Sequence, residues 1–127
     1  MYRTFAEVKS AVSSGKTVVS IVNEYLERIE SHKDLNAFLE VFNVSALEKA
    51  RLVDEKIKAG TAGKLAGMVV GIKDNLCYKG HIVTSASKIL EGFESLFSAT
   101  VVERLLKEDA IIIGRLNCDE FAMGSSN

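Results

Sequence analysis

With 127 residues, 47 % of them hydrophobic, the chain is long enough to close one modest core and is not expected to be disordered. Its formal net charge of -1, with acidic and basic residues interspersed, argues against an electrostatic nucleic-acid footprint. No apolar run approaches the roughly 20 residues that span a bilayer, and the N-terminus lacks the apolar core of a signal peptide, so we expect a cytoplasmic protein without a membrane role.

Two helices are predicted near the N-terminus. Thr4 and Glu7 have the spacing of a capping box and open a short helix that ends near Gly15. A longer amphipathic helix starts near Thr17, with apolar residues at three-to-four-residue spacing: Val18, Ile21, Val22, Tyr25, Leu26 and Ile29.

A strand and a third helix are predicted next. Residues 36–42 alternate loosely and are rich in β-prone side chains, which favours a strand. Residues 44–59 form a helical pattern that Gly60 is well placed to end. Its many charges include two pairs four residues apart, Arg51 with Glu55 and Asp54 with Lys58, and are interpreted as a solvated face.

The second half of the chain predicts a strand over 68–73, a mainly irregular segment over 78–92 and a strand over 110–113. Residues 99–107, between the irregular segment and the strand over 110–113, look helical, with Thr100 and Glu103 as a second possible capping box. Asp109 then stands where a left-handed residue is needed. Because strand, helix and strand follow one another twice, we expect an α/β fold with a mainly parallel sheet.

Few residues carry a metal or redox pattern. Cys77 and Cys118 are far apart and neither belongs to a C-x-x-C pair, so two reduced thiols and no metal site are expected. His32 and His81 are isolated, and a lone histidine is more often a surface residue than a ligand. Ser85 and Lys88 match S-x-x-K, but this short pattern lies in a predicted loop instead of opening a helix, and we give it little weight.

Lys73 is the first candidate for chemistry. It ends the apolar run MVVGIK, at the point where parallel strands present functional residues. From the local pattern alone, such a lysine extends to solvent. If it is instead buried at the strand end, burial favours a neutral amine, which can take a proton from a serine hydroxyl.

Four further segments carry a family resemblance: LAGMVVGIKDN (65–75), TSASKIL (84–90), ATVVERLLKEDAIIIGRLN (99–117) and DEFAMGSSN (119–127). With LNAFLEVFN (35–43), they make nearly the whole chain resemble the N-terminal part of the amidase-signature fold, a mainly parallel or mixed sheet flanked by helices. Within that family the chain is most similar to the glutamine-hydrolysing A subunits of tRNA-dependent amidotransferases. Val69, Gly71 and Cys118 depart from residues common in the family.

The resemblance implies a Ser–cis-Ser–Lys triad in which Lys73 is the lysine. In the family the lysine deprotonates a bridging serine, which deprotonates the serine that attacks the glutamine side-chain amide. The two serines lie in a Gly- and Ser-rich signature beyond this chain. Asp74 and Asn75 are expected to shape the turn that aims Lys73, while the match over the GSS turn suggests that Met123, Gly124, Ser125 and Ser126 line the substrate pocket.

The resemblance also implies partners: the B and C subunits of the amidotransferase, misacylated tRNA bound through the complex, and glutamine. No cofactor is expected on this chain, since ATP and Mg are used by the partner subunit. The alternatives are another amidase-signature amide hydrolase and a non-catalytic interaction module.

Residues 1–127 are expected to be the N-terminal portion of one amidase-signature domain, truncated before the Gly/Ser-rich signature. A base without its two serines cannot form an acyl-enzyme, so the isolated chain is expected to be inactive. It should also expose apolar sheet surface.

Overall fold

The computed structural model describes residues 2–125, so Ser126 of the predicted site lies outside the described residues. Four helices and three strands follow in the order α1 (Phe5–Ser13), α2 (Val18–Ser31), β1 (Phe38–Val41), α3 (Asn43–Ala59), β2 (Val69–Lys73), α4 (Thr100–Lys107) and β3 (Ile111–Leu116). Three short 3₁₀ turns, η1 (Lys33–Leu35), η2 (Lys88–Leu90) and η3 (Glu120–Ala122), lie in the connections. The α/β expectation is confirmed.

The sheet is mixed, in the strand order β1-β3-β2. β2 runs parallel to β3, and Lys73 at the end of β2 pairs with Leu116 at the end of β3. β1 pairs with β3 antiparallel, so only the β2–α4–β3 unit is a parallel crossover and the sheet is not mainly parallel. Within the described residues, β2 and β1 form the two edges.

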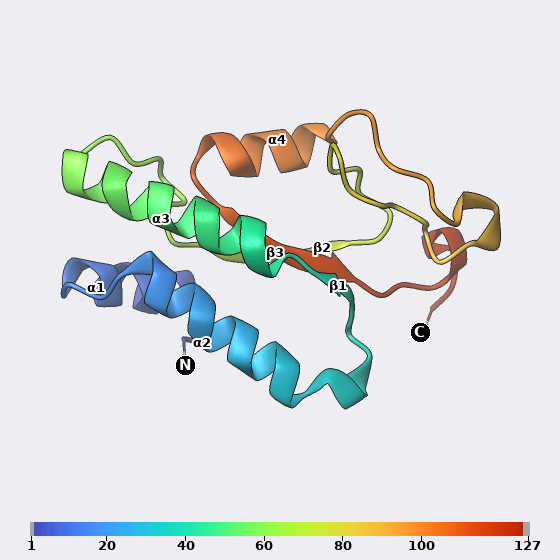
Figure 1. Ribbon diagram of the computed structural model, residues 1–127, viewed down its shortest axis with the longest axis horizontal. Helices are drawn as coiled ribbons and strands as arrows, with labels where there is room; N and C mark the ends of the chain where they lie inside the picture. Colours follow the sequence, from blue (N-terminus) through green and yellow to red (C-terminus); the bar gives the residue numbers. More distant parts are fainter. Residues whose placement is uncertain (1, 126–127) are drawn as a thin grey trace.

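The sheet is covered on both faces (Figure 1). On one face, apolar residues of α2 and α3 pack against Ile111 and Ile113 of β3. On the other face, Val102 of α4 packs with Ile72 and Ile112. The three-to-four-residue spacing of α2 is thereby explained, because its regularly spaced apolar residues Val18, Ile21 and Val22 are all fully buried.

Predicted helix ends are confirmed at Thr4, at Gly60 and at Thr17, which is the N-cap of α2. Thr4 and Glu7 form the predicted capping box of α1, and Gly60 ends α3 with a left-handed φ of 71°. The second predicted capping box is wrong, because α4 begins at Thr100 with Ala99 as its N-cap and no side-chain cap bond.

Asp54 of α3 caps the neighbouring helix. Its carboxylate accepts hydrogen bonds from the backbone N–H groups of Val18 (2.7 Å) and Val19 (3.1 Å) at the start of α2. A carboxylate is favourable at a helix N-terminus because it satisfies free donors and faces the positive end of the helix dipole. The interpretation of Asp54 as part of a solvated face is therefore wrong.

Asp109 ties α3 to the turn that precedes β3. Its side chain is 2 % exposed and accepts bonds from Lys49 Nζ (2.8 Å), Lys56 Nζ (2.7 Å) and the Gly63 N–H (2.9 Å). The residue has the predicted left-handed backbone, with φ of 66°. Burial alone would raise the pKa of Asp109, but the bonds from Lys49, Lys56 and Gly63 outweigh it and lower the pKa to about 2.

This depressed pKa gives a prediction about acid stability. The charged Asp109 stabilises the fold above its unfolded-state pKa, and that contribution is lost as the pH falls from about 5 toward 2. We expect Asp109→Asn, which tolerates the left-handed backbone, to lower the free energy of unfolding at pH 7 by about 1–2 kcal/mol. Urea unfolding at several pH values measures it, and the difference from the unchanged chain should shrink toward pH 2. Equal stability at pH 7, or the same loss with exposed Asp34→Asn, would contradict it.

No helix of the described part of the chain is both long and apolar enough to cross a bilayer. The irregular segment after β2, predicted from its glycines and serines, extends from one end of the sheet and contains η2 and one isolated bridge between Ile82 and Glu94. This segment and the residues after β3 lie at the same end of the molecule (Figure 1), which is where the candidate site forms.

Candidate active site

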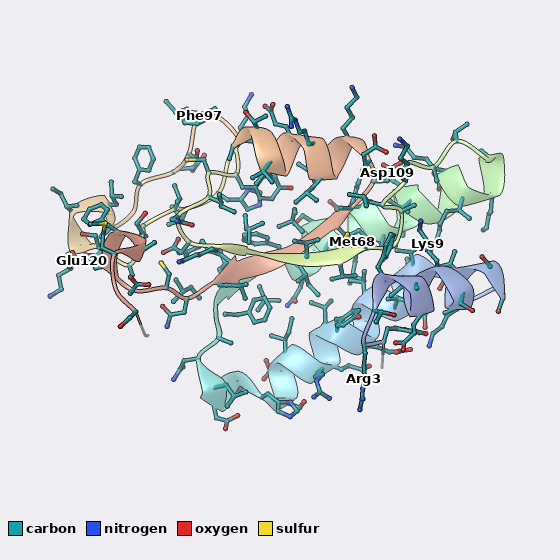
Figure 2. The ribbon with its side chains drawn as sticks, turned by 180° about the vertical axis from the view of Figure 1, so that it is seen from behind. Arg3, Lys9, Met68, Phe97, Asp109 and Glu120 are labelled. Carbon is teal, nitrogen blue, oxygen red and sulfur yellow. The ribbon has the colours of Figure 1, made fainter. Side chains whose placement is uncertain are left out.

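The predicted residues gather at the carboxyl ends of the two parallel strands. Lys73 is the last residue of β2, and the chain after β3 continues into 117–125 beside it. In open α/β sheets this edge commonly binds ligands. Figure 2 shows Glu120 at this end and Asp109 at the opposite end of β3.

Lys73 is exposed, as its local pattern predicts, and residues 2–125 do not supply the burial that would favour a neutral amine. The reason is its place in the sheet: β2 is an edge strand, and the face that carries Val69, Gly71 and Lys73 is only partly covered. Within residues 2–125 no ion pair or hydrogen bond engages its amine. Its role as a base stays a prediction.

Asp74, next to Lys73, is fully buried and organises the site. Its carboxylate accepts hydrogen bonds from Arg115 Nη1 (2.7 Å), from the hydroxyl and N–H of Thr84, and from the Ala86 N–H. Burial alone would raise the pKa of Asp74, but the bonds from Thr84, Arg115 and Ala86 outweigh it and hold the pKa below its usual value. The two amides bonded to the Asp74 side chain belong to residues ten and twelve positions further on, so these bonds hold a distant loop, and the role of Asp74 in the turn after Lys73 stays a prediction.

The loop bound by Asp74 has an unusual backbone. Ser85 and Ala86 both adopt left-handed conformations, with φ of 49° and 53°. Such conformations cost free energy in residues with a Cβ and persist where the surroundings enforce them. The enforcing contacts are the bond from the Ser85 N–H to the Asp74 carbonyl (2.9 Å) and the bonds from the Ala86 N–H to Asp74 and Thr84.

The segment after β3 is bound to this loop. The Phe121 N–H donates to the Ser85 carbonyl (2.8 Å), and the Ser87 hydroxyl donates to Glu120 Oε1 (2.7 Å). The Asp119 carboxylate accepts a bond from the Gly124 N–H, and Met123, Gly124 and Ser125 are exposed. The structure therefore joins β2, the loop 84–87 and the segment 119–124 at one edge, while the pocket-lining role of Met123, Gly124 and Ser125 remains a prediction.

Sequence reasoning missed Arg115 and Thr84. Arg115 spans from Asp74 to Glu40 of β1 (Nη2–Oε2, 3.5 Å), and its buried Nε has no partner among the described residues. The available signal was a charged residue at the end of the apolar run of β3, which is the position that drew attention to Lys73 in β2.

The cysteines and Asn75 add no further candidate for catalysis or metal binding. Burial raises the pKa of the Cys118 thiol, which keeps it protonated, and both cysteines are free as expected. Asn75 is exposed in the turn after Asp74. Across residues 2–125 no three His, Cys, Asp or Glu side chains are grouped so that they could hold a metal ion. The site thus places an exposed amine next to a loop that Asp74 holds with several hydrogen bonds.

Comparisons with known proteins identify the family. The family model described as Amidase matches residues 20–127. The A subunit of glutamyl-tRNA(Gln) amidotransferase from Chlorobium phaeobacteroides is 48 % identical over 128 aligned residues, covering 99 % of this chain and 27 % of the relative. The corresponding A subunit from Chlorobaculum parvum is likewise 48 % identical with the same coverage.

Among solved structures, the peptide amidase of Stenotrophomonas maltophilia superposes with a TM-score of 0.85 at 26 % identity. The alignment covers 94 % of this chain and 25 % of that one. The chain therefore spans about a quarter of the length of the proteins that it matches. Over that span, the sequence comparison and the fold comparison both match amidases or amidotransferase subunits. By its match to the family model over 20–127 and its similarity to the two A subunits, the chain belongs to the amidase family.

Proposed function

We propose that the chain is the N-terminal part of the glutaminase subunit of a tRNA-dependent amidotransferase. The observation that carries this proposal is the 48 % identity to the A subunit of glutamyl-tRNA(Gln) amidotransferase over 99 % of the chain. The activity is hydrolysis of glutamine to supply ammonia, which converts Glu-tRNA(Gln) or Asp-tRNA(Asn) to Gln-tRNA or Asn-tRNA.

In this proposal Lys73 is the base of a Ser–cis-Ser–Lys triad. Its amine takes the proton of a bridging serine, which takes the proton of the nucleophilic serine as that oxygen attacks the glutamine amide carbon. Ammonia leaves, an acyl-enzyme forms, and water then releases glutamate. Lys73 is exposed within residues 2–125, so in this proposal the neutral amine requires that further polypeptide bury it at the strand end.

Asp74 serves as a positioning residue in the same proposal. Its buried carboxylate fixes the strained loop 84–87, to which the segment 119–124 is bonded. Met123, Gly124, Ser125 and Ser126 then line the glutamine pocket, and Asn75 shapes the turn after Lys73. The two triad serines come from outside this chain, so the 127 residues alone do not hydrolyse glutamine.

The partners follow from the same assignment. Ammonia passes to a B subunit that activates the misacylated tRNA with ATP and Mg, a C subunit completes the complex, and the assembly works in the cytoplasm. The chain itself holds no cofactor.

A simple amide hydrolase is the second candidate, supported by the fold shared with a peptide amidase. Identity of 48 % to the A subunit, compared with 26 % to that amidase, favours the amidotransferase. A non-catalytic module is the third candidate and predicts no turnover in any context.

Substrate choice in a chimaera tests the proposal. This chain replaces the matched segment of the A subunit from Chlorobium phaeobacteroides, and the product, called the A-subunit chimaera below, is co-expressed with the partner subunits of that organism. We expect glutamine hydrolysis that rises when misacylated tRNA and ATP are present, and little hydrolysis of simple aliphatic or aryl amides. Preference for simple amides would favour the hydrolase, and no turnover beside an active parent enzyme would favour the module.

A further inference from the structure

The register of the parallel pair shifts by one residue shortly before Arg115. Val70 of β2 lies opposite Ile112 of β3. Two residues further along β2, Ile72 lies opposite Arg115, which is three residues further along β3. Without this shift Arg115 would lie opposite Lys73, and two cations would face each other on the same side of the sheet. The extra residue in β3 therefore turns the Arg115 side chain to the face opposite Lys73.

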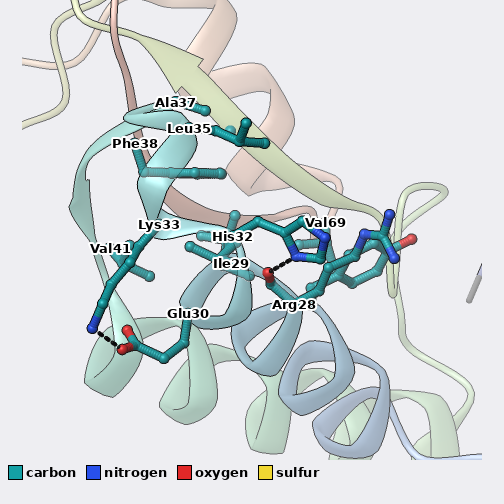
Figure 3. Close-up of a pocket in the computed structure, with 13 residues that line it drawn as sticks. Arg28, Ile29, Glu30, His32, Lys33, Leu35, Ala37, Phe38, Val41 and Val69 are labelled. Atoms are coloured by element: carbon teal, nitrogen blue, oxygen red, sulfur yellow. Dashed lines mark hydrogen bonds and ion pairs between the residues drawn. The ribbon is translucent and has the colours of Figure 1, made fainter.

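The two faces of β2 carry different groups at its end. Val69 and Gly71 line an apolar pocket of about 410 Å³ beside α2 (Figure 3). Because side chains alternate along a strand, Lys73 lies on this same face. Arg115 and Asp74 meet on the other face, where Arg115 Nη1 is 2.7 Å from Asp74 Oδ1. The lysine and the ion pair thus lie on opposite sides of one strand end.

Each polar group of Asp74 has a partner. Its N–H donates to the Leu116 carbonyl of β3 (3.0 Å), while its carbonyl and its carboxylate accept bonds from loop 84–87. Arg115 is the one cation that contacts this carboxylate within the described residues, and its side chain is only 11 % exposed. A buried carboxylate needs such a charge to remain ionised at low cost. Because Asp74 directly follows Lys73, fixing Asp74 also fixes the direction in which Lys73 leaves the strand.

A second register shift brings Glu40 of β1 to the same arginine. Phe38 lies opposite Leu116 of β3. Two residues further along β1, Glu40 lies opposite Arg115, the residue just before Leu116, with Nη2 3.5 Å from Oε2. A planar guanidinium that contacts two carboxylates has its orientation fixed by both. The row Glu40, Arg115 and Asp74 therefore crosses all three described strands at the end where Lys73 lies.

We propose that Arg115 is a positioning residue for the catalytic base, because through Asp74 it holds the end of β2 so that the Lys73 amine keeps one direction. This inference rests on the proposed function, in which Lys73 is the base. Arg115 acts from the opposite face of the strand and does not touch the reacting atoms. A displacement of about 1 Å in a catalytic group costs up to about 10²-fold in rate, so a loosened strand end has a measurable effect.

Replacement of Arg115 in the A-subunit chimaera tests this role. Arg115→Met removes the charge, and Arg115→Lys keeps a cation that can still reach one carboxylate. We expect Arg115→Met to lower kcat for glutamine about 10- to 100-fold and to change KM less than about threefold. Arg115→Lys should keep kcat within about threefold of the unchanged chimaera. Arg104→Met, which removes an exposed arginine of α4, is the matched control and should keep kcat within about twofold.

Hydrogen exchange in the same variants measures the strand end directly. The backbone amides of Asp74 and Thr84 are hydrogen-bonded in the fold and should exchange at least about fivefold faster in Arg115→Met than in the unchanged chimaera. Amides of Ile21 and Val22, which are buried in α2, should change less than about twofold. Unchanged exchange at Asp74 and Thr84 would overturn the proposal.

A double variant separates positioning from loss of stability. Arg115→Met leaves a buried carboxylate unpaired, whereas Asp74→Asn with Arg115→Met leaves no buried charge and is expected to fold even if the single variant does not. Its kcat should still be at least about tenfold low, because no cation joins β3 to the end of β2. A folded double variant with the kcat of the unchanged chimaera would overturn the proposal, as would a low kcat in Arg115→Lys equal to that of Arg115→Met.

The kinetic result also distinguishes this inference from the proposed function. An active chimaera whose Arg115→Met variant keeps its kcat refutes the positioning role alone. A chimaera that is inactive before any substitution, beside an active parent enzyme, refutes the proposed function and leaves no base for Arg115 to position.

Discussion

Lys73→Ala in the A-subunit chimaera is expected to lower the rate of glutamine hydrolysis by about 10²- to 10⁴-fold. A positioned general base contributes an acceleration of that order, and a serine nucleophile without its base stays protonated. The effect should fall on kcat, because the amine acts in the proton transfers of the reaction instead of holding the ground-state substrate. Steady-state release of glutamate at varied glutamine concentration measures it.

Lys107→Ala is the matched control for this variant, since Lys107 is also exposed but lies at the end of α4, where it belongs to no predicted site. Its kcat should stay within about twofold of the unchanged chimaera. Because both lysines are exposed, neither replacement should shift the unfolding transition by more than about 0.5 kcal/mol. A kcat for Lys73→Ala close to that of Lys107→Ala would remove Lys73 from the triad.

Local pattern was sufficient for the helices and insufficient for the arrangement of strands. The apolar spacing of α2, the capping box at Thr4 and the left-handed ends at Gly60 and Asp109 depend on neighbours within a few residues, and these predictions are confirmed. The antiparallel pairing of β1 depends instead on which strand edge it reaches, 70 or more residues along the chain. Nothing in the local composition of β1 specifies that choice.

In the candidate site, too, residues that are neighbours in the sequence could be predicted and contacts between distant residues could not. Lys73, Asp74 and Asn75 are consecutive and could be proposed together from the sequence, whereas Arg115 reaches Asp74 across 41 residues. Lysines of α3 that look solvated likewise bind Asp109 across 53 and 60 residues. A charge in a helical pattern shows no sign of a distant partner, so the interpretation of a solvated face was wrong for such residues. The exposure of Lys73 at the end of an edge strand agrees with its local pattern, which predicts a lysine that extends to solvent.

Removing the Asp74 carboxylate is expected to cause the largest loss of stability available at the site. Asp74→Ala leaves the guanidinium of Arg115, whose side chain is only 11 % exposed, without its 2.7 Å partner, and it removes the acceptor of the Thr84 N–H and hydroxyl. Breaking a buried ion pair by removing one partner costs about 3–5 kcal/mol, a large share of the 5–15 kcal/mol typical of a whole domain. Urea unfolding at pH 7 measures the change. The same replacement at exposed Asp34 is the control and should change the free energy of unfolding by less than about 0.5 kcal/mol.

A second replacement separates the charge effect from simple loss of packing. When Arg115→Met is added to Asp74→Ala, no unpaired charge remains buried, so the double variant is expected to regain about 1–3 kcal/mol relative to Asp74→Ala alone. The pH dependence gives an independent check. The pKa of Asp74 is lowered in the fold, so its contribution is present above the unfolded-state pKa and is lost as the pH falls, and the penalty of Asp74→Ala should shrink in acid. A double variant no more stable than Asp74→Ala would show that Asp74 acts through the backbone of loop 84–87 alone. That result would leave Arg115 without a part in holding the site.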